Sequence, residues 1–406
     1  MTNSMHRVAI TGLGVICALG KNTKEFWSSL QQGKVGIAPI TAIDRSCLRF
    51  QNGAEVRDYN PHDYFQPKQA DLMDRFAQFA VIAAKEAVKD AGLELTPEIC
   101  SATAVITGAC VGGQSSEDQG FYDIYRANRN RVHPMTIPKT MANAGASLIC
   151  MELGITGAAF TISTACSSAA HAVGLGYSMV ASGAAPVALV GGSEAPFSLG
   201  LLKAWEALRV VSPGTCRPFS KDRSGMILGE GGAMLVLEPM ESAKARGVRI
   251  YGEVAGFGMS SDACHITHPS PDGAAAAMQR ALSHAGVAPE QVGYINAHGT
   301  GTEVNDSTET AAIRKVFGAH ADKLAVSSTK SMHGHTLGAA GALEAAAAVL
   351  ALRDGILPPT ANFTTPDPAC NLDVIPNEAR KTQVECCLSN SFAFGGLNAA
   401  LVFKSA

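Results

Sequence analysis

The chain alternates between strand-like and helix-like runs, and its second half repeats the order of the first. Strand-like runs cover residues 8–11, 103–108, 160–163, 186–191, 249–257, 292–296 and 324–328. Helix-like runs cover residues 73–91, 166–181, 273–285, 307–317 and 338–353. Alternation of this kind predicts an α/β fold with a largely parallel sheet covered by helices.

Each half also closes on a similar glycine-containing segment. Residues 226–237 read M-I-L-G-E-G-G-A-M-L-V-L, and residues 389–403 read S-N-S-F-A-F-G-G-L-N-A-A-L-V-F. Both patterns are typical of a β-hairpin with a glycine turn. They predict two similar units, residues 1–245 and 246–406, with an active site at the seam between them.

Composition excludes several classes of protein. Of 406 residues, 47% are apolar and 17% are charged, which indicates a globular chain, and a net charge of -3 favours neither nucleic acid nor an anionic membrane as partner. The eleven cysteines are odd in number and form no C-x-x-C motif, so reduced thiols are expected. The most apolar helix-like run, residues 337–352, contains Glu344 and is too short to cross a bilayer. We therefore expect a soluble, cytoplasmic protein.

The first candidate catalytic segment is T-A-C-S-S, residues 164–168, between a strand-like and a helix-like run. A cysteine at a helix N-terminus gains from the helix dipole and from free N–H groups, which lower the pKa of its thiol. The same N–H groups can hold an oxyanion. Cys166 is therefore a candidate nucleophile, and a small buried thiol is the alternative.

Two further segments offer histidines after strand-like runs. N-A-H-G-T-G-T places His298 ahead of two glycines and two threonines, where α/β folds bind substrates. S-T-K-S-M-H-G-H-T-L-G-A-A-G places Lys330 five residues before His335. A nearby lysine disfavours an imidazolium, and a neutral ring can donate a hydrogen bond to a developing oxyanion. For His298 alone, a core histidine bonded to a carbonyl is the alternative.

A metal site is the rival interpretation of these histidines. His333 and His335 form an H-x-H pattern that could chelate a metal with His298. His265 and His268 are a second pair that could bind a metal. No acidic or cysteine ligand lies at a familiar zinc spacing, so we expect no metal and interpret His265 and His268 as loop residues near the site.

In combination, the three motifs resemble those of the β-ketoacyl-[acyl carrier protein] synthases. Their order is that of this family, and the likeness runs from V-A-I-T-G-L-G-V at 8–15 to N-S-F-A-F-G-G-L-N at 390–398. It is greatest to the elongating, KAS-II-like branch of the thiolase superfamily, with type II polyketide and Nod-factor ketosynthases nearby. The resemblance implies the five-layered αβαβα thiolase fold of two similar halves, the decarboxylative condensation of malonyl-ACP with an acyl group, and a dimer.

The resemblance also implies roles for individual residues. Cys166 would carry the acyl thioester, and His298 and His335 would stabilise the enolate of malonyl-ACP. Backbone N–H groups of Cys166 and Phe394 would form the oxyanion hole. Lys330 and Glu309 would form a supporting ion pair, with Asp306 and Glu344 in the same polar shell. Thr300 and Thr302 would contact the phosphopantetheine arm, which the substrate carrier protein supplies, so no cofactor is expected.

Departures from the family pattern concern the partner and the acyl chain. The segment that docks the acidic carrier protein keeps one cation, Lys68, and further candidates are Arg126, Arg129, Arg131 and Lys203. Trp205 and Val111 match positions that line the acyl tunnel, where smaller or different side chains are usual, and Phe394 matches a gatekeeping phenylalanine. These changes leave the primer, the chain length and the pathway open and indicate a specialised synthase.

Three related functions stay as alternatives. A thiolase would have a second cysteine near the C-terminus, where this chain has Cys386 and Cys387 before the last motif. A priming, KAS-III-like enzyme would have Cys-His-Asn in place of Cys-His-His. A non-catalytic chain-length-factor-like subunit would lack the nucleophile, although this chain could be the active ketosynthase of a heterodimer with such a partner.

Overall fold

The computed structural model describes residues 5–406 and contains one ten-stranded sheet, in the order β10-β9-β13-β14-β8-β1-β7-β6-β4-β5. Its strands are β1 Val8–Cys17, β4 Thr103–Gly108, β5 Ala159–Ile162, β6 Val187–Glu194, β7 Gly231–Pro239, β8 Gly252–Ser261, β9 Tyr294–Asn296, β10 Ala325–Ser327, β13 Cys386–Phe392 and β14 Leu397–Lys404. Two small sheets pair β2 Ala38–Pro39 with β3 Asn52–Gly53, and β11 Ile356–Leu357 with β12 Arg380–Lys381.

The large sheet consists of two halves with the same topology. Outward from the centre, one half runs β1-β7-β6-β4-β5 and the other runs β8-β14-β13-β9-β10. In both, the first three strands pair antiparallel and the outer three pair parallel. The halves join where β1 pairs with β8. The repeat predicted from the sequence is therefore confirmed, whereas the predicted largely parallel sheet is wrong, because five of its nine strand pairings are antiparallel.

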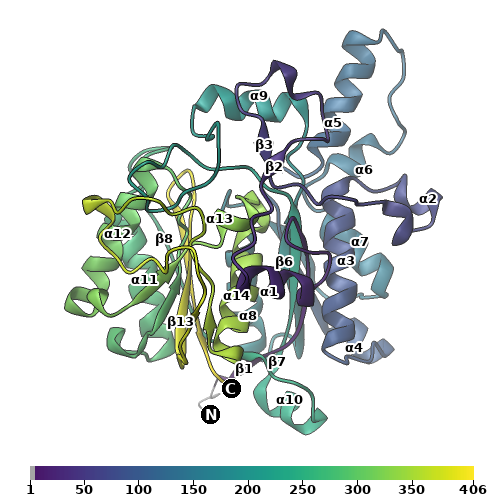
Figure 1. Ribbon diagram of the computed structural model, residues 1–406. Helices are drawn as coiled ribbons and strands as arrows, with labels where there is room; N and C mark the ends of the chain where they lie inside the picture. Colours follow the sequence, from purple (N-terminus) through teal and green to yellow (C-terminus); the bar gives the residue numbers. More distant parts are fainter. Residues whose placement is uncertain (1–4) are drawn as a thin grey trace.

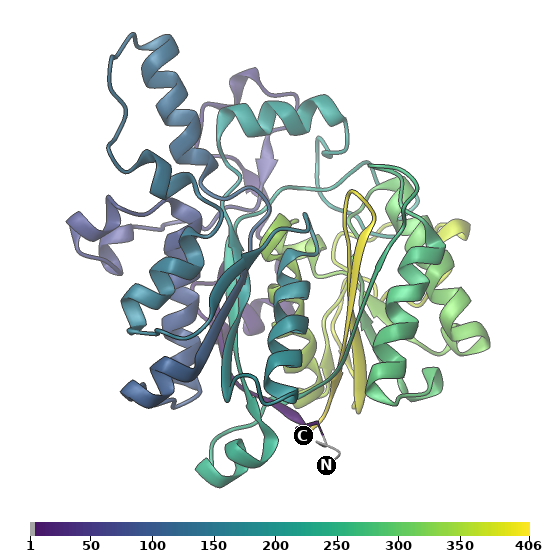
Figure 2. The same cartoon turned by 180° about the vertical axis from the view of Figure 1, so that it is seen from behind.

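Helices complete five layers, as Figures 1 and 2 show. α3 and α7 cover the outer face of the β1–β5 half, and α11 and α12 cover the outer side of the other half. α8 and α14 lie between the two halves and contact strands of both. The bounds of these helices are α3 Arg75–Asp90, α7 Ala144–Leu153, α8 Ser168–Ala181, α11 Pro271–Ala285, α12 Glu303–Phe317 and α14 Ala340–Asp354. The thiolase-like αβαβα fold predicted from the resemblance is confirmed.

Shorter elements connect these strands and helices; α5 and α9 stand at the top of the view in Figure 1, and α4 and α10 lie at its bottom. The shorter elements are α1 Thr23–Gln31, α2 Pro67–Ala70, α4 Pro97–Ala102, α5 Gln114–Phe121, α6 Thr136–Thr140, α9 Leu199–Leu208, α10 Met240–Arg246 and α13 Lys330–His333, with a π-helical turn at Tyr122–Arg126. Short 3-10 turns lie at Arg45–Cys47, Pro61–Asp63, Pro289–Gln291, Gly318–Asp322, Leu337–Ala339 and Pro368–Cys370. Within residues 5–406, none of the helices combines the length and apolar character needed to span a bilayer.

Small residues allow the close packing of helices on the sheet. A Cβ on Gly12 would lie 2.1 Å from the Ala87 carbonyl oxygen, and one on Gly14 would lie 1.9 Å from the Ala83 carbonyl oxygen. α3 therefore lies directly on β1, because neither strand nor helix has bulk at these contacts. α14 is rich in alanine, and residues 340–352 are buried on all sides between the two halves.

The hairpin predicted at residues 226–237 is wrong, whereas the one at 389–403 is confirmed. Residues 226–229 bridge to Val211, His335 and Ala54, and only from Gly231 does β7 pair with β1 and β6. Gly231 does not form a turn but lets β7 approach β1 closely, since a Cβ at this position would lie 2.3 Å from the Ile16 carbonyl oxygen. In the second segment, β13 and β14 pair across a turn with Gly395 and Gly396 at φ +84° and +70°.

Candidate active site

Cys166 lies in a tight turn between the edge strand β5 and helix α8. Ala165 adopts φ +50°, so the chain turns sharply immediately before the cysteine. Ser167 Oγ donates to the carbonyl oxygens of Thr164 and Leu397, each at 2.8 Å. The serines of T-A-C-S-S thus fix the turn, and Ser167 also ties it to β14. The helix begins at Ser168, two residues later than predicted, so Cys166 lies just before its N-terminus.

The free thiol of Cys166 is less acidic than the sequence suggested. The cysteine is 7% exposed, and burial raises the pKa of its thiol to about 11. Lys330 and the backbone N–H groups of Phe394 and Cys166 act in the opposite direction. The predicted net lowering is wrong because desolvation outweighs these donors. The thiolate is stabilised by the two N–H groups named from the resemblance as an oxyanion hole.

His298 lies between β9 and α12 with its ring held in one tautomer. Its backbone N–H and that of Gly299 donate to the two oxygens of Glu309, at 2.9 and 2.8 Å. Lys330 Nζ lies 3.3 Å from His298 Nδ1 and donates to the His298 carbonyl oxygen at 2.7 Å. Because an ammonium group can only donate, Nδ1 accepts and the ring proton is on Nε2.

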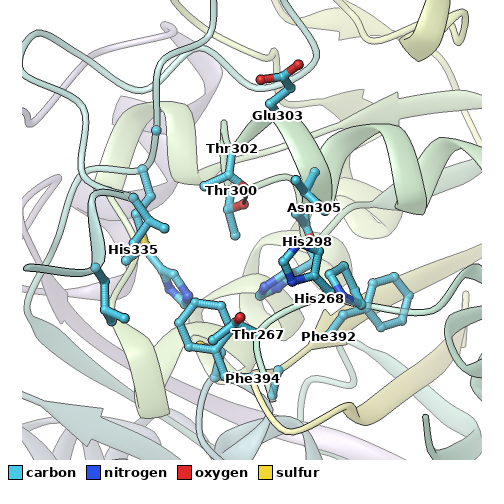
Figure 3. Close-up of a pocket in the computed structure, with 18 of the residues that line it drawn as sticks. Thr267, His268, His298, Thr300, Thr302, Glu303, Asn305, His335, Phe392 and Phe394 are labelled. Carbon is cyan, nitrogen blue, oxygen red and sulfur yellow. Dashed lines mark hydrogen bonds between the residues drawn. The ribbon is translucent and has the colours of Figure 1, made fainter. Parts of the chain in front are cut away.

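His335 is held in the same tautomer by a different donor. The backbone N–H of Leu337 donates to His335 Nδ1 at 3.2 Å, which leaves the proton on Nε2. The two rings lie 5.5 Å apart at 86°, and both line one cavity with Cys166 (Figure 3). Burial, with the charge of Lys330, holds the pKa of both imidazoles well below 6.5. The site therefore presents two neutral N–H donors beside a thiol.

The supporting ion pair differs from the one predicted. Lys330 Nζ contacts the carboxylate of Glu344, and both side chains are fully buried. Glu309 instead binds backbone N–H groups, as above, and accepts from Asn390 Nδ2 at 3.2 Å. The Lys330–Glu309 pair is therefore wrong. Because Glu309 accepts the backbone N–H groups of His298 and Gly299, Glu344 is the carboxylate that pairs with Lys330.

Asp306 also acts through backbone groups. Its carboxylate accepts from Phe219 N at 2.8 Å and from Gly301 N at 3.2 Å, and Arg223 lies 3.8 Å away. Burial raises the pKa of Asp306 to about 6 and that of Glu309 and Glu344 to about 7. Asp306 and Glu309 hold the loop of residues 297–302 directly, and Glu344 acts on it through Lys330, which donates to the His298 carbonyl oxygen.

The cavity has a volume of about 430 Å³ and contains most of the predicted site residues. Thr300 and Thr302 line it and share a hydrogen bond of 2.9 Å between their hydroxyls. Phe394 lies in the β13–β14 turn and stacks on Trp205 of α9, with centroids 6.2 Å apart at 28°. His265 and His268 are exposed loop residues that line the cavity, as expected. Val111 is not among the lining residues, so its tunnel role stays a prediction.

The structure adds residues that motif reasoning missed. Glu194, the last residue of β6, is fully buried and accepts backbone N–H groups from two loops beside the site. Burial raises the pKa of Glu194 to about 7. Its only sequence signal is an acidic residue at the end of an otherwise apolar run, V-A-L-V-G-G-S-E. Asn390 and Arg223 are likewise visible only through their contacts with Glu309 and Asp306.

The rival cysteines and histidines lie elsewhere. Cys386 and Cys387 begin β13, six and five residues before the cavity-lining Phe392, or about 20 Å away at the usual rise of a strand. His333 directs its nitrogens to the Gly334 carbonyl at 2.8 Å and to Thr329 Oγ1 at 3.0 Å. Among the residues described, no group of three or more histidine, cysteine and acidic side chains is arranged to hold a metal ion.

A thiolase-like fold with a cysteine and two neutral histidines around one cavity defines a class of acyl-transferring enzymes. The family model for the N-terminal domain of β-ketoacyl synthases matches residues 5–243, and that for the C-terminal domain matches residues 251–364. The chain belongs to the β-ketoacyl synthase family. It is an acyltransferase whose activity is the condensation that forms a β-ketoacyl product.

Individual relatives agree with this assignment. Nodulation protein E of Rhizobium sp. (strain N33) is 45% identical over 398 residues, 98% of this chain and 99% of that protein. The 3-oxoacyl-[acyl-carrier-protein] synthase 2 of Coxiella burnetii is 42% identical over 406 residues, 98% of each chain. The solved structure of the ishigamide ketosynthase/chain length factor has a TM-score of 0.95 at 38% identity and covers 99% of this chain and 100% of its own.

Chelators provide a direct test of the metal alternative. If His298 and His335 act as hydrogen-bond donors, EDTA should leave the condensation rate unchanged, because no step uses a Lewis acid. Elemental analysis of the purified protein should find no stoichiometric zinc. Activity lost to the chelator and restored by added zinc would contradict the assignment.

Proposed function

We propose that the enzyme joins malonyl-ACP to an acyl group held on Cys166, by decarboxylative Claisen condensation, in fatty-acid or polyketide-type biosynthesis. The observation that carries this proposal is the pair of Nε2–H donors of His298 and His335 directed into the cavity of Cys166. Both tautomers are set by donors to Nδ1. A site built this way fits a reaction that develops negative charge on a thioester oxygen.

In the first half-reaction, Cys166 takes the acyl chain from its carrier. Sγ attacks the thioester carbonyl of acyl-ACP, and the tetrahedral oxyanion accepts the N–H groups of Cys166 and Phe394. The pantetheine thiolate leaves and takes up the proton that the cysteine thiol releases. Because the free thiol is protonated at neutral pH, its deprotonation accompanies attack, and the two N–H groups lower the cost.

In the second half-reaction, malonyl-ACP supplies the carbon nucleophile. Its carbon–carboxylate bond breaks, carbon dioxide leaves, and the electron pair forms an enolate whose oxygen accepts from His298 and His335. The enolate carbon attacks the Cys166 thioester and the cysteine thiolate is expelled. Lys330 contributes indirectly, because burial and, after it, the charge of Lys330 keep both imidazoles neutral, and its ammonium holds His298 Nδ1 as an acceptor.

The carrier protein would reach the cavity through its phosphopantetheine arm. Thr300 and Thr302 line the cavity with hydroxyls that suit the amides of that arm. For docking, Lys68, Arg126 and Arg131 are exposed cations. Two other candidates are already engaged, since Arg129 lies 3.5 Å from Asp123 and Lys203 lies 2.9 Å from Glu206. We therefore favour Lys68, Arg126 and Arg131 as the docking cations for an acidic carrier.

A second copy of this chain is the proposed partner. β5 is the edge of the sheet, and its Ala159 and Phe160 are exposed beside free backbone groups. A chain-length-factor-like partner on the same edge is the alternative, suggested by the ishigamide ketosynthase/chain length factor. Light scattering of the isolated protein distinguishes them: an active dimer supports a homodimer, and an inactive monomer supports a heterodimer.

One experiment tests the reaction as a whole. The protein is incubated with a panel of acyl-ACPs, then with malonyl-ACP, and intact-protein mass spectrometry follows both proteins. The proposal expects an acyl adduct on Cys166, followed by its loss as a β-ketoacyl-ACP two carbons longer appears. An adduct without elongation by malonyl-ACP would overturn the condensing function.

Trp205 is expected to limit the acyl chain. It is 9% exposed, lines the cavity and stacks on Phe394. Each buried methylene contributes about 0.8 kcal/mol, or about fourfold in binding, so tunnel length strongly affects selection. Trp205→Ala should lengthen the preferred acyl chain while short chains still acylate Cys166.

The matched control is Trp27→Phe. Trp27 lies on α1, is not among the residues that line the cavity, and donates its indole N–H to the Asp354 carboxylate. Trp27→Phe should leave chain preference as in the wild type. Unchanged preference in a folded Trp205→Ala protein would assign Trp205 to core packing.

A further inference from the structure

Glu194 is a buried carboxylate that joins two loops on either side of the catalytic cavity. One of its oxygens, Oε2, accepts from Cys110 N at 2.6 Å and from Gly338 N at 3.2 Å. The other, Oε1, accepts from Val111 N at 3.4 Å. Glu194 forms no salt bridge with any of the described residues 5–406, so its main partners are backbone N–H groups. A carboxylate without a cation at full burial is costly and indicates a specific task.

The contact with Gly338 is built for close approach. A Cβ on Gly338 would lie 2.6 Å from Glu194 Oε2 and 2.4 Å from Cys110 N. Glycine is therefore required for the carboxylate to reach the backbone of this turn. The turn belongs to the segment G-H-T-L-G, which also carries His335.

The same turn determines the tautomer of His335. Leu337, the neighbour of Gly338, adopts φ +48°, in the left-handed region that residues carrying a Cβ disfavour. In this conformation its N–H donates to His335 Nδ1 at 3.2 Å. The backbone N–H of Gly338, the residue after Leu337, donates to Glu194 and so holds the strained backbone of Leu337 in place.

Glu194 also acts on the nucleophile. Burial is the main reason that the pKa of the Cys166 thiol is raised, and the negative charge of Glu194 adds to it, against the effect of Lys330. Loss of this charge should therefore make Cys166 more reactive, whereas loss of its hydrogen bonds should disturb His335. The two consequences have opposite signs, which a residue that serves only as core filling would not produce.

We propose that Glu194 is a positioning residue that, through the Leu337–Gly338 turn, holds His335 with Nε2–H directed at the enolate of the malonyl substrate. This role rests on the function proposed above for His335. It gives the acidic residue at the end of β6 a positioning role in the decarboxylation half of the reaction, beside its electrostatic effect on the Cys166 thiol.

The test is Glu194→Gln, which removes the charge and replaces one acceptor oxygen with an NH₂ donor. Release of carbon dioxide from malonyl-ACP should fall about tenfold or more in kcat with KM little changed, since a small misplacement of a catalytic group has an effect of this size. Alkylation of Cys166 by iodoacetamide at pH 8 should be faster than in the wild type, because loss of the Glu194 charge lowers the pKa of the thiol and raises the thiolate fraction.

Glu86→Gln is the matched control. Glu86 also accepts two backbone N–H groups, from Val15 and Thr23 at 2.8 Å each, but it lies on α3 away from the cavity. It should leave both rates unchanged. Melting temperature and circular dichroism of each variant establish that the fold is intact. A folded Glu194→Gln protein with wild-type decarboxylation would overturn the proposal.

Two further variants separate this proposal from the one on which it rests. In a His335→Ala background, Glu194→Gln should cause no further loss of decarboxylation, since its effect passes through His335. Should His335→Ala alone have no effect, the proposed function fails, whatever Glu194 does. If Glu194→Gln does not fold, Gly338→Ala displaces the turn from the other side. It should slow decarboxylation without faster alkylation, and an unchanged rate there would also overturn the proposal.

Discussion

Replacing Cys166 with alanine is expected to abolish condensation and to leave the fold intact. Loss of a covalent nucleophile costs about 10⁴- to 10⁶-fold in kcat. The thiol is 7% exposed and the turn around it is held by the hydroxyls of Ser167 and Ser168, so alanine removes one sulfur and no structural hydrogen bond of that turn. The measurements are elongation of acyl-ACP by malonyl-ACP and the melting temperature.

The acyl adduct supplies the decisive observation. Peptide mapping of wild type after acyl-ACP treatment should place the acyl mass on Cys166, and Cys150→Ala, a half-buried cysteine of α7, should retain both adduct and activity. Because burial raises the pKa of Cys166 to about 11, its alkylation rate should still rise between pH 8 and pH 10. An adduct on another cysteine with Cys166 unmodified would remove it from the mechanism.

The fold was largely predictable because its signals are local. Strand-like and helix-like runs report their own periodicity, and β4 begins and ends where the sequence placed it, at Thr103 and Gly108. The predicted hairpin at 226–237 failed for a non-local reason. A glycine pair looks the same whether it turns the chain or lets two strands approach, and only the Ile16 carbonyl beside Gly231 distinguishes the two. The division at residue 245 stays a prediction.

The candidate site divides in a similar way. Cys166, His298 and His335 each follow a strand in a small-residue segment, and such motifs are visible in a single sequence. The partner of Lys330 could not be predicted from the sequence. Glu309 and Glu344 are both buried acids, and only their surroundings determine which one pairs with the lysine. The acidity of Cys166 likewise depends on its burial and on groups distant in the sequence, among them Lys330 and the backbone N–H of Phe394.

The second large effect is expected from the two histidines, and it should be confined to one half-reaction. His298→Ala and His335→Ala each remove one N–H donor from the enolate, and loss of such a donor costs about 10²- to 10³-fold in kcat. Acylation of Cys166 should persist in both, since the oxyanion of that step is held by backbone N–H groups.

Carbon dioxide release from malonyl-ACP and acyl-adduct formation, measured separately, distinguish the two steps. His320→Ala is the control, because His320 lies on the 3-10 turn Gly318–Asp322 and its Nε2 forms a hydrogen bond with the Val292 carbonyl oxygen. Since the pKa of both catalytic imidazoles lies well below 6.5, neither ring becomes charged between pH 8 and pH 6, and decarboxylation should not fall over that interval on their account. If the histidine variants lost acylation and kept decarboxylation, the roles would have to be exchanged: the rings would then serve the nucleophile, and the enolate would need other donors.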